Sequence, residues 1–563
     1  MERNAILATV LVILILLGYQ WYVAKFETPQ LTPAAQSAAT PPAASGTAPA
    51  TAAPAPTATV AQAAAPAMPR TYTPTAQGGV SPREVTVETP LLRVILTTAG
   101  AKATHWQLKS YRVASGELVD LVTPSTAIPQ GPLSAWADLE QAGAFFEVDR
   151  TSLDLKVGDE PARVTFTNIS SRGIQLTKTL VFRADRYDVG VEIAAKNLAE
   201  ADQTVQPRLA WGPGLRNSHD KDASALQPPT TWLDGKRQQE DLEKLTGERI
   251  LEGTPTWTAL QDNYFAAALL PGQEGTKAFV FLGGPKQPVV GLTLPAQSLR
   301  PGAQVDFKAD IFAGPRDLDI LKASGKHLDQ LVDLGWFDFL ARPALWLLKF
   351  LYAYTGNYGI AIILVTILQK VIFHPLTHKS LKSMQAMQAM QPKVQALQER
   401  YKNNPQKKQE ETMALYRKHG VNPMGGCLPM LIQIPIFVAL YNALSSSVEM
   451  WQAGFLWIND LTQPDALFNL PLWGGTSMGF NLLALLMGAS MWFQQKMSPT
   501  MGDPRQAQIM LWMMPIVFTW MFWSFPSGLV LYWLVNNFLQ IGQQWLITGR
   551  PSSPSAPAEA PAA

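Results

Sequence analysis

A lysine lies inside one of the most apolar stretches of this 563-residue sequence, the run from Gly359 to Phe373, where Lys370 is the only charged residue. Thr366 precedes it by four residues, so the two share one face if the run is helical, and Gln369 lies three residues from Thr366. The apolar runs of the C-terminal third contain no Asp or Glu to pair with the lysine. A charge at membrane depth costs roughly 2.5–3.5 kcal/mol. Lys370 must therefore face a hydrated cavity or extend to the interface.

Both interpretations of Lys370 stay open from the sequence. Pro375 is only five residues away, about 7 Å of helix, and a lysine side chain can extend that far to reach the interface. The polar face continues inward to Thr366, which favours a hydrated cavity. Other amides lie inside the apolar runs, and any one of them could instead make an interhelical hydrogen bond worth roughly 0.6 kcal/mol. These amides are Gln433, Asn442, Asn481, Asn536, Asn537 and Gln540.

Six apolar runs are candidates for membrane spans, because about 20 apolar residues cross a bilayer as a helix. The chain is therefore predicted to be a polytopic α-helical membrane protein, with six transmembrane helices of which five form a core at 356–547. The runs are 5–24, 356–373, 428–444, 478–493, 509–525 and 529–547.

The distribution of Lys and Arg predicts the orientation, whereas the net charge of +2 says little. The segment 375–420 carries nine of these residues and the loop 445–477 carries none. We therefore expect both termini and the basic segment in the cytoplasm. The large region before the second span must then lie across the membrane, in the periplasm of a bacterium.

The N-terminal residues 1–27 are predicted to be a retained transmembrane anchor. Aromatic residues close its apolar stretch, as in interfacial belts. Small-residue sites such as Ala35–Ala38 leave a cleaved signal peptide as the alternative. Residues 28–79 are rich in Ala and Pro and lack the side chains for a core, so we expect a disordered tether there, and a disordered tail at 548–563. The single cysteine, Cys427, excludes a disulfide within the chain.

Residues 80–330 are predicted to form a large antiparallel β-sandwich. Short segments with apolar residues at every second position are separated by Gly, Pro, Asn and Asp. Histidines in this region stand alone, and a lone histidine is usually structural, so no catalytic centre is predicted. The expected strands are 84–88, 91–97, 162–167, 174–182, 187–193, 278–282 and 304–308.

Two further segments are predicted to be helical but not to span the membrane. Residues 331–355 place aromatic and aliphatic residues among few charges, as an amphipathic helix in the interface does. Residues 376–420 are basic and predict a cytoplasmic hairpin of two helices joined near Asn404. Flexible methionines on this hairpin suit the capture of varied apolar segments, although a packed hairpin core explains them as well. They are Met384, Met387, Met390 and Met413.

The sequence contains no P-loop, metal-ligand cluster or nucleophile motif. We therefore expect no enzymatic activity, no cofactor, no metal and no specific nucleic-acid binding. Two rival functions remain. A secondary transporter would also place polar residues in its spans, but the spans lack a carboxylate for ion coupling and no internal repeat is evident. An envelope enzyme acting on carbohydrate would depend on the β region.

Five segments resemble the signatures of the YidC membrane protein insertases in their long, Gram-negative form, and the resemblance covers nearly the whole chain. The segments are Lys370–Thr377, Val421–Pro429, Gln433–Phe437, Gln495–Pro499 and Phe525–Tyr532. The resemblance implies an insertase and chaperone for inner-membrane proteins, acting alone or with the Sec translocon. It also implies a β-supersandwich similar to galactose mutarotase, with ribosomes and the receptor of the signal recognition particle as partners besides nascent chains and membrane lipids.

The resemblance also implies two surfaces for the incoming protein. One is a hydrophilic groove with a single positive charge, matched here by Lys370 where the family typically has arginine; lysine keeps the charge but loses the two-pronged hydrogen bonding. The tail also lacks the strongly basic character that binds ribosomes. The groove residues are Lys370, Thr366, Gln369, Gln433, Asn536 and Asn537. The other surface is an apolar slide formed by Met430, Ile434, Phe437, Met510, Met514, Phe518, Tyr532 and Trp533.

Overall fold

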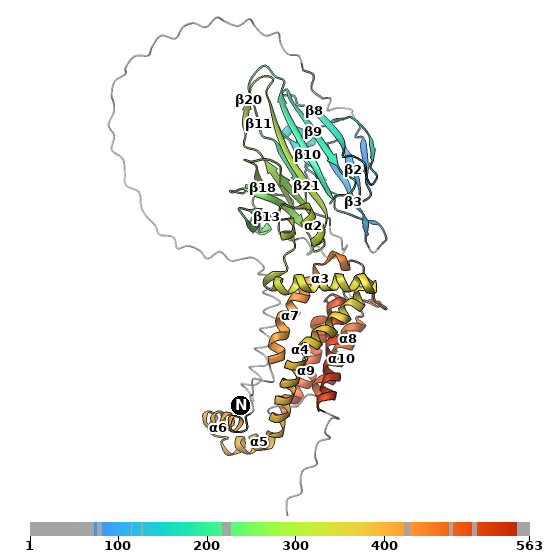
Figure 1. Ribbon diagram of the computed structural model, residues 1–563. Helices are drawn as coiled ribbons and strands as arrows, with labels where there is room; N and C mark the ends of the chain where they lie inside the picture. Colours follow the sequence, from blue (N-terminus) through green and yellow to red (C-terminus); the bar gives the residue numbers. More distant parts are fainter. Residues whose placement is uncertain are drawn as a thin grey trace, which may run out of the picture.

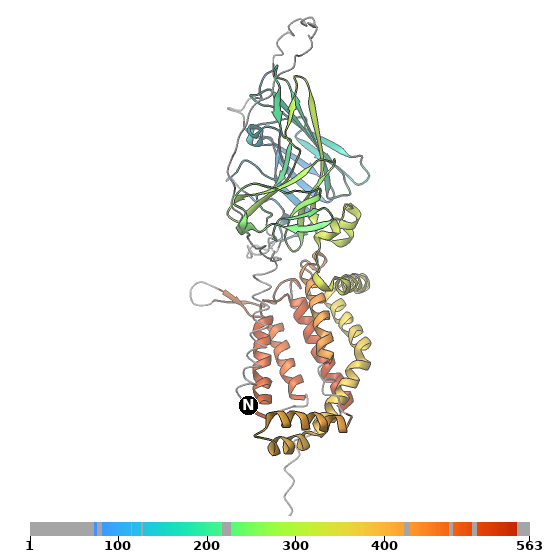
Figure 2. The same cartoon turned by 90° about the vertical axis from the view of Figure 1, so that its left-hand side faces the viewer.

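The computed structural model describes residues 72–75, 81–113, 115–124, 128–216, 227–420, 428–471, 477–497 and 504–548. The predicted anchor and nearly all of the predicted tether and tail lie outside these residues. Figure 1 shows the strands gathered at one end of the molecule and a helical bundle at the other, with helix α3 lying across the junction. The hairpin of α5 and α6 lies at the end of the bundle farthest from the strands, as the turned view in Figure 2 also shows.

The β region consists of large sheets in which most neighbouring strands are antiparallel; among the described strands, only β1 and β7 pair in parallel. One sheet of nine strands has the order β14-β13-β16-β17-β21-β10-β9-β8-β6, and two sheets of five strands have the orders β15-β18-β19-β12-β5 and β4-β3-β2-β1-β7. The strands are β1 Glu84–Glu88, β2 Leu92–Thr97, β3 Lys102–Arg112, β4 Leu118–Asp120, β5 Ser134–Trp136, β6 Glu147–Val148, β7 Ser152–Asp154, β8 Ala162–Ile169, β9 Ile174–Phe182, β10 Asp188–Asn197, β11 Gln203–Val205, β12 Arg208–Trp211, β13 Thr230–Leu233, β14 Lys236–Gln239, β15 Arg249–Ile250, β16 Pro255–Gln261, β17 Phe265–Pro271, β18 Lys277–Gly284, β19 Gln287–Thr293, β20 Gln297–Leu299 and β21 Gln304–Pro315.

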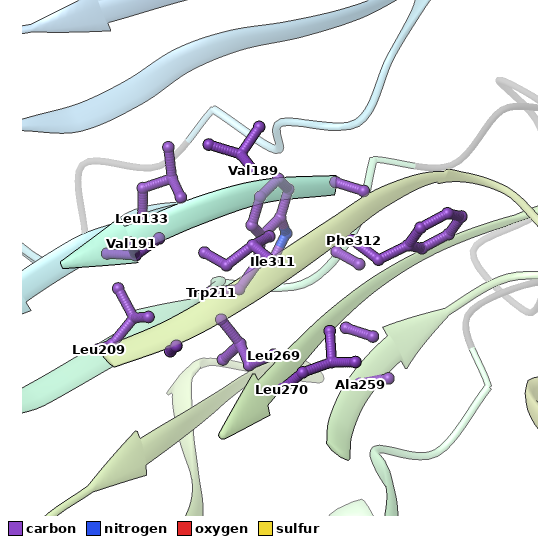
Figure 3. Packing of buried hydrophobic residues seen from close by; sticks show 14 of the residues in the cluster. Leu133, Val189, Val191, Leu209, Trp211, Ala259, Leu269, Leu270, Ile311 and Phe312 are labelled. Carbon is purple, nitrogen blue, oxygen red and sulfur yellow. The ribbon is translucent and has the colours of Figure 1, made fainter. Parts of the chain in front are cut away.

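The core of the β region lies between the sheets, where the inward side chains of each strand meet (Figure 3). In β10 buried and partly exposed residues alternate along the whole strand, as period two requires. Trp106 and Trp211 are fully buried and meet edge to face with their ring centroids 5.4 Å apart. The Trp106 indole N–H donates to the Ala313 carbonyl at 3.0 Å. This antiparallel sandwich confirms the predicted fold class of the N-terminal region.

The helical region begins after β21. Its helices are α2 Leu318–Ser324, α3 Asp338–Thr355, α4 Tyr358–Ala389, α5 Gln391–Arg400, α6 Pro405–Lys418, α7 Leu428–Ser445, α8 Leu482–Met497, α9 Pro504–Phe522 and α10 Ser527–Thr548, and a short hairpin of β22 Asn469–Pro471 and β23 Ser477–Gly479 lies between α7 and α8. Within the described parts of the chain, only α4 combines the length and apolar character of a membrane span; α7 and α9 hold shorter apolar segments. The count of six spans stays a prediction.

Helix α4 differs from the expected division between a span ending at Phe373 and a separate hairpin starting at residue 376. It runs without a break for 32 residues through Pro375. Proline removes the hydrogen bond to the carbonyl four residues earlier, that of Val371. Val371 itself is an exposed residue. The Thr377 hydroxyl adds a bond to the Phe373 carbonyl at 3.0 Å. The first part of the segment expected as the hairpin, up to Ala389, is therefore a continuation of the span, and the separate helix α5 begins at Gln391.

Lys349 of α3 joins the β region to the helical bundle. Its Nζ donates to Asp317 and Asp319 of the α2 N-terminus, at 3.2 and 2.5 Å, and lies 3.2 Å from a carboxylate oxygen of Glu449 in the α7–α8 connection. Partial burial alone would lower the pKa of Lys349, but the bond with Asp319 and the charges of Glu449 and Asp317 raise it above its ordinary value. In the same connection, the Trp451 indole donates to the Arg112 carbonyl at 2.8 Å.

Helices α8 and α9 are in close contact at Gly488. A Cβ atom added there would lie 1.9 Å from the hydroxyl and 3.2 Å from Cβ of Thr519, whose hydroxyl donates to the Pro515 carbonyl at 2.7 Å. We expect Gly488→Ala to lower stability by about 1–3 kcal/mol through overpacking, measured as the thermal midpoint in detergent. Thr519→Ala in the same chain should restore much of the loss. The control is Gly542→Ala on α10, where an added Cβ would meet no atom of another described element within 4 Å. Equal midpoints for both single variants would contradict the close packing.

Candidate functional site

Lys370 projects from α4 toward α10. Its Nζ donates to Oε1 of Gln540 at 2.7 Å, across 170 positions of sequence. The lysine is partly buried, and within the described ranges no carboxylate oxygen lies within ion-pair distance of it. The partner of this cation is therefore a neutral amide.

A second row of polar groups lies beside Lys370 and links three helices. Gln369 of α4 donates through Nε2 to Oε1 of Gln433 on α7 at 3.3 Å, and Gln433 donates in turn to the hydroxyl of Tyr532 on α10. The Oε1 atom of Gln369 is buried and has no hydrogen-bond partner among the described residues. A buried acceptor without a partner is costly, so a polar group entering here would gain a ready contact.

The polar contacts continue along α4 and α10 toward the hairpin. His374, one turn after Lys370, lies with Nδ1 2.7 Å from Nε2 of Gln543, one turn after Gln540 on α10. Both helices therefore present polar side chains at matched intervals of a turn. The residues of these contacts are called the polar seam: Gln369, Lys370, His374, Gln433, Tyr532, Gln540 and Gln543.

Two residues expected in the groove bond elsewhere. Thr366 is fully buried, and its hydroxyl donates to the Ile362 carbonyl of its own helix at 2.7 Å. Asn537 is also buried and donates to the Ser490 hydroxyl of α8 at 3.0 Å, which is the interhelical role that any single amide could have. Its neighbour Asn536 has a buried Oδ1 without a partner among the described residues. The structure thus brings Lys370, Gln369 and Gln433 together but keeps Thr366 and Asn537 within helix packing.

Comparison with known proteins assigns both halves of the chain. The family model described as the 60Kd inner membrane protein matches residues 350–553, and the model of the YidC periplasmic domain matches residues 84–347. A membrane protein insertase YidC from Syntrophus aciditrophicus is 38% identical over 97% of this chain and 99% of the relative. One from Geobacter metallireducens is 38% identical over 97% and 98%.

The chain belongs to the YidC membrane protein insertase family. Among solved structures, an active YidC insertase with its first transmembrane domain resolved covers 82% of this chain and 92% of that one, at 19% identity and a TM-score of 0.35. A galactose mutarotase-like protein from Lactobacillus casei covers 41% and 99%, at 12% identity and a TM-score of 0.30. Scores this low do not support a comparison of structural detail, so the YidC assignment rests on sequence.

The residues expected to form the slide from the YidC resemblance lie in different surroundings. Phe437, Phe518 and Trp533 form one aromatic cluster that joins α7, α9 and α10, with centroids 5.1 Å apart for Phe437 and Trp533 and 6.0 Å for Phe518 and Trp533. Ile434 and Met510 are exposed, and Met514 is partly buried. Tyr532 belongs to the polar seam, and the Met430 side chain lies outside the described ones. The aromatic cluster therefore borders the seam through consecutive residues of α10.

The methionines of the expected YidC capture hairpin differ in exposure. Met387 and Met390 are buried, only 3% and 6% exposed, where α4 passes into α5. Met413 on α6 is exposed, and Met384 is intermediate. In this conformation the protein covers Met387 and Met390, so of these four methionines only Met413 and part of Met384 are open to a partner.

Proposed function

We propose that this protein is an insertase that transfers newly made membrane proteins into the inner membrane of a bacterium. The family assignment supports the activity, and the match of residues 84–347 to a periplasmic domain supports the location. The single observation that carries the mechanism is the Lys370 cation, which lies in an apolar helix with a neutral amide as its hydrogen-bond partner.

The polar seam supplies what a polar segment of the incoming protein needs during transfer. Lys370 attracts an acidic side chain or a peptide carbonyl, because a charge-assisted hydrogen bond is stronger than the one to Gln540. The unpartnered oxygen of Gln369 accepts an N–H group. Polar groups that enter lipid lose their hydrogen bonds to water, and lipid tails offer none in return. The seam offers such bonds and thereby lowers the free-energy cost of moving polar groups through the apolar layer.

The apolar span of the incoming protein leaves on the side of the aromatic cluster. Its transfer into lipid releases about 25 cal/mol for each Å² of apolar surface removed from water. This free energy is available without nucleotide. We propose a transfer in which no covalent bond is made or broken, so the proposed activity is not enzymatic. The two hairpin methionines that remain accessible, Met384 and Met413, are proposed as the first contacts of the client.

We further propose the topology and partners expected from the sequence. The anchor 1–27, tether 28–79, β domain 80–330, interfacial helix 331–355, core 356–547 and tail 548–563 would place six spans in the membrane, with both termini cytoplasmic. Nascent inner-membrane proteins are the substrates. The Sec translocon, ribosomes and the receptor of the signal recognition particle are the proposed partners, and the proposal for them rests on resemblance alone.

Reconstitution tests the proposal directly. The purified protein is placed in liposomes of bacterial lipid, and a single-span client with an acidic tail is added during translation. We expect the tail to become protected from external protease in liposomes with the protein and to stay accessible in empty ones. Equal protection in both kinds of liposome would contradict an insertase. Uptake of a solute without client insertion would favour the transporter instead.

A further inference from the structure

A tight turn in the α7–α8 connection holds its backbone in an unfavourable conformation. Phe455 and Ile458 exchange backbone hydrogen bonds at 2.8 and 2.9 Å, with Leu456 and Trp457 between them. Leu456 has φ +53°, in the left-handed region, where glycine or asparagine is usual and a branched aliphatic residue costs about 1 kcal/mol. Strained residues of this kind are enriched at functional sites.

The same turn exposes the apolar side chains at its tip. Leu456 is 76% exposed and Trp457 is 38% exposed, and the segment 450–459 contains no charged residue. Trp457 is held in place through its indole N–H, which donates to the Asp465 carboxylate at 3.1 Å. A leucine that is both strained and open to water would be doubly unfavourable in an aqueous loop. The turn is therefore suited to an apolar environment outside the protein. Leu456 and Trp457 are called the apolar tip.

The position of the apolar tip identifies that environment. Asn357, the residue before α4, donates through its side chain to the Gly454 carbonyl at 3.1 Å, so the turn lies at the entry of the longest apolar helix. The Trp451 bond to Arg112 places the connection on the side of the β region, which matches the family's periplasmic domain.

Helix α3 ends at the same place and exposes an aromatic stripe. Trp346, Phe350 and Tyr354 lie at intervals of four residues, are all exposed, and follow one another with ring centroids 5.5 and 5.0 Å apart. Trp and Tyr are enriched at membrane interfaces, where one end of the ring is apolar and the other is wet. Figure 1 shows α3 lying crosswise to the bundle, as a helix in an interface does. The bond from Asn357 to Gly454 places the turn with the apolar tip next to the C-terminal end of α3.

We propose that the turn 455–458 inserts Leu456 and Trp457 into the lipid interface of the periplasmic leaflet. The lipid contact removes Leu456 from water and thereby offsets the strain of its backbone. Together with α3, the turn would give the bundle two lipid contacts at one level of the membrane. It would also hold the α7–α8 connection at a fixed depth in the membrane. This connection carries Glu449 and Trp451, which contact the rest of the protein. The inference requires α4 to span the membrane but does not depend on the insertase activity.

A depth probe tests the inference in the full chain. In a Cys427→Ser background, Leu456→Cys carries an environment-sensitive fluorophore, and the protein is placed in nanodiscs containing lipids spin-labelled near the headgroup. We expect a blue-shifted emission and quenching several-fold stronger than at the control Leu139→Cys, an exposed leucine of the β region. Emission as in water with quenching equal to the control would overturn the proposal. An apolar emission without lipid quenching would also overturn it, because protein would then cover the tip.

A matched pair of variants separates the leucine side chain from the loop as a whole. The reporter is a fluorophore at Asn459→Cys, just after the turn. Leu456→Asn and Gln452→Asn each place asparagine at an exposed position with φ +53°, but only the first removes an apolar side chain. We expect Leu456→Asn to reduce lipid quenching several-fold and Gln452→Asn to leave it unchanged, with the thermal midpoint in detergent kept or raised by both. Equal quenching in the two variants would overturn the proposal.

Discussion

Lys370→Glu is expected to abolish insertion of a client with an acidic tail, and Lys370→Ala to reduce it by about tenfold or more. A hydrogen bond to a charged group contributes about 1.5–3 kcal/mol, and glutamate adds repulsion. Lys370→Arg should keep insertion, since the charge remains. The measurement is protease protection of the client tail in cells depleted of the native protein and supplied with each variant at equal level. Full insertion with alanine would show that Lys370 only extends to the interface.

Gln540 provides a sharper form of the same experiment. Gln540→Glu would place a carboxylate at the 2.7 Å contact of Lys370, so the cation would be neutralised inside the protein while the lysine itself stayed in place. We expect insertion of the acidic client to fall as it does for Lys370→Ala. Gln388→Glu makes the same change of charge on the exposed extension of α4, outside the polar seam, and should have little effect. If the two substitutions reduced insertion equally, general surface charge would explain the result.

The partner of Lys370 could not be predicted, although the lysine itself could. The sequence alone shows that Lys370 lies in an apolar run that contains no carboxylate to pair with it. Which amide lies opposite depends on the rotation and register of α10 against α4, and these are set by packing over the whole interface. Gln540 and Asn537 are both amides of one run, but they lie three residues apart, and only Gln540 faces Lys370. The same limit explains why Thr366 was expected in the groove.

The strands differ in the same way: some could be predicted from the local sequence pattern, and others depend on what surrounds them in the fold. β9 was predicted with its observed bounds because it alternates through nearly all of its length. β17 was not predicted, since its residues Phe265 to Leu270 are all buried and a run buried on both faces has no period of two. The continuation of α4 was missed for another reason. Proline usually ends a helix, so a boundary was expected near Pro375, but α4 continues through it to Ala389.

Lys178 gives the β region an unusual dependence on pH. The side chain is fully buried in β9, and its Nζ donates to the carbonyl groups of Ala101, at 2.6 Å, and of Leu133. Burial lowers the pKa of the amine from 10.5 to about 7. Between these values the unfolded chain binds more protons than the folded one, so the free energy of unfolding rises with pH. The cost of burying the charge is fully present below pH 7 and disappears above pH 10.5.

The expected result is a gain of stability in mildly alkaline solution that Lys178→Met does not share. From pH 7 to pH 9 the wild type should gain about 2 kcal/mol more than the variant, because one unit of pKa difference corresponds to about 1.4 kcal/mol. Urea unfolding of the full-length protein in detergent, followed by a brief protease pulse that cuts only the unfolded β region, measures both. Other titrating groups are common to the two proteins and cancel in the difference. Parallel curves for the two proteins would mean that the amine is not titrated in this range, and the two carbonyl groups would then hold Lys178 in its charged form.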